Sequence, residues 1–214
     1  MNLQKLILTE NACYKAGRKI TVKGIMVHST GANNPWLKRY VGPDDGKLGK
    51  NQYNNHWNKS GVKKCVHAFI GVDDSGKVKI YQTLPFDFRC WGCGSGKDGS
   101  YNNYYLQFEI CEDNLTDENY FNKVYKEGCE ITAYLCKMYN LNPKGIVRMN
   151  GVNVPVILDH ATSCKLGFGS NHGDVQHWFK KYGKTLDDVR NDVAKLMEEI
   201  PVAPSIIKPK VEEE

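Results

Sequence analysis

The chain has 214 residues, of which 41% are hydrophobic and 25% charged, and its formal net charge is +5. This composition is that of one globular domain with one core, and no stretch reaches the roughly 18 apolar residues that a membrane-inserted helix needs. The modest cationic excess favours approach to an anionic polymer such as a cell wall, and it argues against a nucleic-acid partner, for which cations cluster on one face.

The first ten residues are too short and too polar for a signal peptide, so we expect synthesis in the cytoplasm without an export signal. The 8 Cys predict mostly reduced thiols, because a chain of this length can bury a core without disulfides. Cys90 and Cys93 form a lone CxxC. Its pairing, or a role in metal binding, stays open at this point.

The predicted elements mix strands and helices along the chain. We expect strands at 24–27, 66–73, 78–84, 105–111 and 156–158, and helices at 53–57, 119–139 and 186–200. The last helix follows Thr185 and Asp188, which resemble a capping box with Asp in place of Glu. This order predicts an α/β domain over residues 1–200, with a central mixed β-sheet flanked by helices on both faces. Residues 201–214 contain three Pro and predict a linker, leading to a cell-wall-binding domain outside this chain.

Two histidines stand directly after apolar runs that predict buried strands. His28 follows residues 25–27, and His160 follows residues 156–159. One such histidine is usually structural, but two of them with an acid in a Gly-rich loop indicate a zinc site with one open position. Spacing alone leaves four candidates for the third ligand, which are Cys164, His172, Asp174 and His177.

Four stretches of the chain resemble the type-2 N-acetylmuramoyl-L-alanine amidases, zinc enzymes that share their fold with peptidoglycan recognition proteins. The stretches are 27–30, 66–82, 106–112 and 159–179. They occur in the order of the family and together span residues 25–180, which is most of the chain. The resemblance implies the fold of that family, Zn²⁺ as cofactor, and hydrolysis of the amide between N-acetylmuramic acid and L-alanine of peptidoglycan.

The resemblance also implies a role for each candidate residue. His28, His160 and Asp174 correspond to the zinc ligands, and Glu109 corresponds to the acid that accepts and returns a proton. The family often has a Lys two residues before the last ligand. Here that position is His172, for which we expect stabilisation of the oxyanion.

Substrate contacts are expected from polar and aromatic side chains around these residues. The Gly-rich loop 86–105 is rich in aromatic residues, whose faces suit sugars and peptides, although the same residues can instead anchor the loop to the core. Trp36 and Trp57 can supply an opposite wall. The residues expected to contact the substrate are Thr30, Trp91 and Tyr101.

Two classes of function fit this sequence. The first is a bacteriolytic amidase of a phage or prophage, an endolysin that reaches the cell wall through a holin-type pore. The second is a non-catalytic peptidoglycan-binding module of the same fold. Such a module lacks a zinc ligand, whereas His28, His160 and Asp174 are all present, which favours the enzyme. Oligomeric state, host and stem-peptide preference are not predicted.

Overall fold

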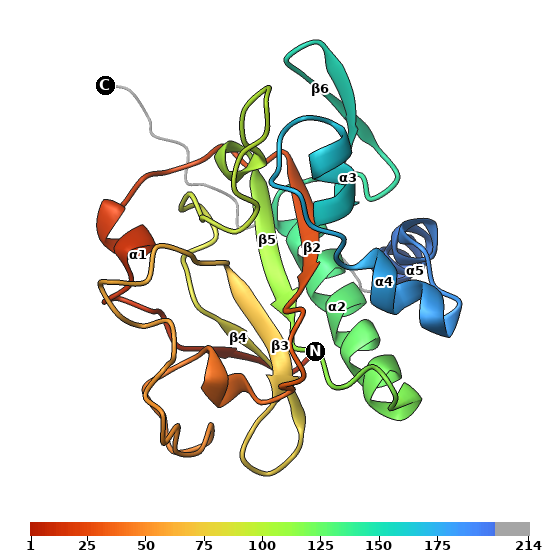
Figure 1. The fold of residues 1–214 in the computed structure, drawn as a ribbon. Helices are drawn as coiled ribbons and strands as arrows, with labels where there is room; N and C mark the ends of the chain where they lie inside the picture. The colour runs from red at the N-terminus through yellow and green to blue at the C-terminus, as the bar shows by residue number, and fades with distance from the viewer. Residues whose placement is uncertain (200–214) are drawn as a thin grey trace, which may run out of the picture.

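The computed structural model describes residues 1–199 (Figure 1). The linker predicted at 201–214 lies outside the described residues. At the centre is a six-stranded mixed sheet with the order β1-β4-β3-β5-β2-β8. Its strands are β1 (Leu3–Lys5), β2 (Gly24–Ser29), β3 (Ala68–Val72), β4 (Val78–Gln82), β5 (Tyr105–Ile110) and β8 (Ile157–Asp159). The five strands predicted from the sequence are confirmed, with small shifts at their ends.

Four neighbouring strands run in one direction. β3, β5, β2 and β8 pair in parallel, whereas β4 is antiparallel to β3 and β1 is parallel to β4. In the β2–β5 pairing His28 lies beside Glu109, and β8 ends one residue before His160. The topology therefore brings these three residues to the carboxyl ends of adjacent strands, where open α/β sheets bind their ligands.

Two long helices, α2 (Glu118–Met138) and α5 (Leu186–Glu199), pack on one face of the sheet (Figure 1). Asp117 caps α2 by accepting a hydrogen bond from the backbone N–H of Tyr120. The predicted capping box of α5 is confirmed. Asp188 N–H donates to Thr185 Oγ1 at 3.2 Å, and Thr185 N–H donates to Asp188 Oδ2 at 2.8 Å.

The opposite face of the sheet carries the polar residues. Side chains alternate between the faces of a strand, so Val27 and Phe108 pack toward α2 whereas His28 and Gln107 point away from it. Loops cover this second face, including the 3₁₀ turns η1 (Leu37–Arg39) and η2 (Tyr101–Asn103). The expectation of helices on both faces is therefore corrected, since both long helices lie on one face.

The helix predicted at 53–57 is wrong, because this segment forms turns. Asn51 explains the difference: its Nδ2 donates to Lys38 O at 2.8 Å, and its Oδ1 accepts from Tyr53 N–H at 3.2 Å. Asn side chains that bond nearby backbone groups in this way compete with helix formation.

Short elements that the sequence did not reveal complete the fold. They are α1 (Ala12–Ala16), β6 (Ile146–Met149), β7 (Val152–Pro155), α3 (His160–Lys165), α4 (Gln176–Phe179) and η3 (Lys180–Tyr182). Each has too few residues to display a hydrophobic period. Across residues 1–199, no helix combines the length and the apolar character needed to cross a membrane.

Candidate active site

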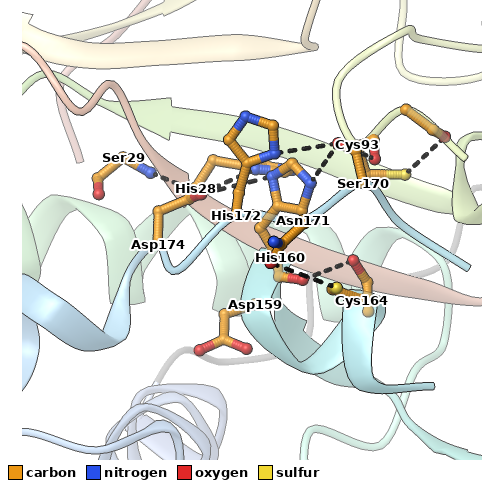
Figure 2. Close-up of polar contacts among 12 residues, drawn as sticks. His28, Ser29, Cys93, Asp159, His160, Cys164, Ser170, Asn171, His172 and Asp174 are labelled. Carbon is orange, nitrogen blue, oxygen red and sulfur yellow. Dashed lines mark hydrogen bonds and ion pairs between the residues drawn. The ribbon is translucent and has the colours of Figure 1, made fainter. Parts of the chain in front are cut away.

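Three side chains from separate segments meet at the carboxyl ends of the strands. His28 comes from β2, His160 is the first residue of α3, and Asp174 lies in the loop before α4. One ligand atom from each lies within 4.8 Å of the other two. Asp174 lies between the rings, with Oδ2 3.1 Å from His28 Nδ1 and Oδ1 3.4 Å from His160 Nδ1 (Figure 2).

This donor set fits a catalytic zinc. Two imidazoles and one carboxylate leave one position open for water or substrate. Burial and the neighbouring His28 lower the pKa of His160 to about 4, so its ring is neutral near pH 7. Burial opposes ionisation of Asp174, but its contacts with His28 outweigh that effect and lower its pKa. A neutral imidazole and an ionised carboxylate are the forms that bind a metal.

The other candidates for the third ligand lie outside this cluster. Cys164 Sγ is 3.9 Å from Asn171 Oδ1, and His177 Nε2 pairs with Glu112 Oε1 at 2.9 Å. His172 is closer, because its ring centroid is 4.5 Å from that of His160. Its Nδ1, however, is 3.0 Å from Ser170 Oγ, and within residues 1–199 the metal-binding group consists of His28, His160 and Asp174.

Glu109 is the acid that faces the same space. It lies on β5 beside His28, and its buried Oε2 has no hydrogen-bond partner within the described chain. Burial raises its pKa to about 7, against the opposing effect of His28. Glu112 is engaged elsewhere, since its Oε1 accepts from Ser29 Oγ and pairs with His177. Glu109 is therefore the better placed of the two acids to move a proton.

A cavity of about 520 Å³ opens onto the cluster. Thr30, Trp91 and His172 line it, as do Glu109 and Asp174. Aromatic and cationic residues that complete the wall are Arg39, Tyr40, Trp57 and Lys64. Of these, the sequence pattern indicated only Trp57, because the others lie in loops without a periodic signal.

Tyr101 does not contact this cavity, so its expected role in substrate binding is corrected. Its side chain has 0% exposure, and its ring stacks on Phe168 at a centroid distance of 4.7 Å. Tyr101 anchors the Gly-rich loop to the core, which is the alternative that an aromatic-rich loop leaves open. All eight thiols are free, Cys90 and Cys93 included.

The raised pKa of Glu109 predicts a pH-dependent cost of folding. In the metal-free protein its pKa rises from an ordinary value of 4.5 to about 7, so the folded state holds this proton more tightly than the unfolded chain. Stability is therefore lost as pH rises through this window, by at most about 3 kcal/mol. We expect metal-free Glu109→Gln to unfold at a higher temperature than the wild type at pH 8. The two should be nearly equal at pH 4, and an equal difference at both pH values would contradict the assignment.

A cavity that joins a cluster able to hold a metal to an acid able to transfer a proton is typical of a hydrolytic enzyme. The sequence profile described as N-acetylmuramoyl-L-alanine amidase matches residues 17–176. The chain belongs to this family and is an amidase, as the sequence motifs implied. Among curated proteins, no sequence matches the chain.

Several solved structures share the fold. Staphylococcus aureus hydrolase AmiA, in complex with its ligand, superposes with a TM-score of 0.60 at 21% identity, over 92% of this chain and 82% of that one. The PlyG catalytic domain superposes with a TM-score of 0.60 at 16% identity, over 98% of this chain and 100% of that one. A mutant endolysin from Bacillus subtilis superposes with a TM-score of 0.56 at 19% identity, over 90% of this chain and 99% of that one.

Proposed function

We propose that this amidase is zinc-dependent and hydrolyses the amide between N-acetylmuramic acid and L-alanine in peptidoglycan. The observation that carries the proposal is the convergence of His28 Nδ1, His160 Nδ1 and the Asp174 carboxylate at the wall of a cavity that Glu109 also lines. Zinc, when bound there, polarises a carbonyl group and lowers the pKa of water. The family to which the chain belongs supports the choice of bond.

Glu109 supplies the proton transfers. As water adds to the amide carbon, the Glu109 carboxylate takes one proton from it. The protonated acid then returns that proton to the nitrogen of L-alanine while the carbon–nitrogen bond breaks. A pKa of about 7 suits both steps, because the group is ionised and protonated in comparable amounts near neutral pH.

His172 is placed to stabilise the negative charge that develops on the carbonyl oxygen. It lines the cavity beside His160, and a ring N–H is a hydrogen-bond donor for an oxyanion. We expect His172→Ala to retain zinc and to lose roughly 10²–10³ in turnover, the effect of removing one oxyanion donor. His172→Lys should recover part of that loss, since the Lys ammonium group can donate a hydrogen bond to the oxyanion. Turnover of the Ala variant near the wild-type value would end this assignment.

Zinc content and amide cleavage are measured together to test the function. We expect one zinc per chain, and release of free N-terminal L-alanine from purified cell walls. A chelator should stop the release and added Zn²⁺ should restore it. Release that is insensitive to the chelator would refute zinc dependence, and bound zinc without release would refute the proposed bond.

The proposal includes a lytic role on the bacterial cell wall, reached through a holin-type pore. A net charge of +5 favours approach to an anionic wall, and one protein with a similar fold is described as an endolysin. We expect the added protein to clear suspensions of membrane-permeabilised cells, and to do so more slowly at high salt. Absence of clearing, with cleavage of purified walls intact, would refute the lytic role.

A further inference from the structure

The outer nitrogen of His28 begins a buried chain of hydrogen bonds. His28 Nε2 is 2.8 Å from Gln107 Oε1, and Gln107 Nε2 donates to Asn102 Oδ1 at 2.8 Å. Asn102 Oδ1 also accepts from the backbone N–H groups of Gly92 and Cys93, each at 3.1 Å. Gln107 is 0% and Asn102 4% exposed, so solvent does not replace these partners.

The backbone N–H groups of Gly92 and Cys93 fix which atom donates and which accepts in each of these hydrogen bonds. A backbone N–H can only donate, so the Asn102 atom that faces Gly92 and Cys93 must be its oxygen. That oxygen requires the NH₂ group of Gln107, which turns Gln107 Oε1 toward His28. Oε1 can only accept, so His28 carries its proton on Nε2. In the neutral ring the lone pair is then on Nδ1, the atom that faces Asp174.

A second chain orients His160 from the same turn. Ser170 N–H donates to Cys93 O at 2.9 Å, and Ser170 Oγ donates its single proton to Cys93 O at 3.2 Å. Cys93 O is the one partner of Ser170 Oγ that can only accept, so Oγ donates there and accepts from His160 Nε2 at 3.1 Å (Figure 2) and from His172 Nδ1 at 3.0 Å. His160 Nδ1 keeps its lone pair and faces Asp174, as His28 Nδ1 does.

We propose that Gln107 and Ser170 are positioning residues that fix both metal-binding histidines with the proton on Nε2, and that the turn 92–94 with Asn102 supports both. The expected effect on zinc binding rests on the proposed function, whereas the orientation of the two histidines rests only on these hydrogen bonds. It also gives the lone CxxC a role. Cys93 has a free thiol 3.2 Å from Asn102 Oδ1, and its backbone bonds both chains, so it supports the site as a structural residue.

The test separates the two histidines. Gln107→Met keeps the side-chain length but removes the acceptor for His28, and Ser170→Ala removes the acceptor for His160. Each should weaken zinc binding by about 10–100-fold, the usual effect of losing a partner of a ligand. Nitrogen NMR of the metal-free proteins at alkaline pH should show Nε2–H on both histidines in the wild type. Gln107→Met should release only His28 to a mixture of tautomers, and Ser170→Ala only His160.

Two further variants serve as controls. Gln82 is the last residue of β4 and lies away from the cluster, where its side chain donates a hydrogen bond to Leu84 O. Gln82→Met removes this bond and should change neither the zinc affinity nor the histidine tautomers. Asn102→Asp keeps an oxygen toward Gly92, Cys93 and Gln107 and loses only the bond from Asn102 Nδ2 to Gly94 O at 3.2 Å. It should therefore retain the His28 tautomer, whereas Asn102→Leu should lose it. If Gln107→Met does not fold, the Asn102 pair and Ser170→Ala decide the same question.

Unchanged tautomers in Gln107→Met and Ser170→Ala would overturn the inference, as would loss of the tautomer in Asn102→Asp. A wild type that binds no zinc would contradict the proposed function instead. The tautomers of the metal-free proteins would still decide whether Gln107 and Ser170 position the histidines.

Discussion

Asp174→Ala should leave the protein folded, free of zinc and without measurable amidase activity. Asp174 supplies the carboxylate between the two imidazoles, with oxygens 3.1 and 3.4 Å from their Nδ1 atoms. Two histidines alone leave a zinc site short of a ligand. The fold should persist, because a catalytic metal contributes less to folding than a structural one. Zinc content, circular dichroism and release of L-alanine measure the three expected results.

A control distinguishes loss of the ligand from loss of surface charge. Asp187 is exposed on α5, pairs with Arg190 and does not line the cavity, so Asp187→Ala should keep zinc and activity. Full zinc occupancy in Asp174→Ala would remove Asp174 from the ligand set. His172, whose ring lies beside His160, would then be the next residue to replace.

Glu109→Gln should keep its zinc and lose at least about 10²-fold in turnover, the range for a positioned proton-transfer group. The amide preserves size but cannot accept the proton of water. Glu112→Gln is the matched control, because Glu112 is bonded to Ser29 and His177 and does not line the cavity. The control should lose much less turnover. If the two variants had the same small effect, Glu109 would have only a structural role.

The residues on regular elements were the ones that the sequence could predict. His28 follows the continuous apolar run 25–27, which predicts a buried strand. Glu109 lies on a strand in which apolar and polar residues alternate, and this alternation predicts both the strand and the face. Gln107 carries the same signal, since Gln107 and Glu109 alternate with Leu106 and Phe108 along β5. That pattern places Gln107 on the site face. It does not reveal the partners of Gln107, which are contributed by distant segments.

The residues on loops could not be placed by pattern alone. Asp174 follows a Gly-rich stretch without periodicity, so spacing could not choose it over Cys164 or His177, and the family resemblance made the choice. For Tyr101, the predicted contact with substrate was wrong. An aromatic residue in a loop can face solvent or the core, and only tertiary packing against Phe168 decides that it is buried.

The pairing of β2 with β5 has a consequence for redesign of this enzyme. His28 and Glu109 are neighbours in that pairing, so backbone hydrogen bonds of the sheet set the spacing between the proposed metal ligand and the proposed proton-transfer acid. The cavity wall comes mostly from loops, including Arg39 and Trp91. Exchange of those loops should therefore alter which cell walls are cut while the spacing of ligand and acid stays constant. The sheet fixes the relative positions of His28 and Glu109, whereas the loop residues of the cavity wall can differ according to the substrate.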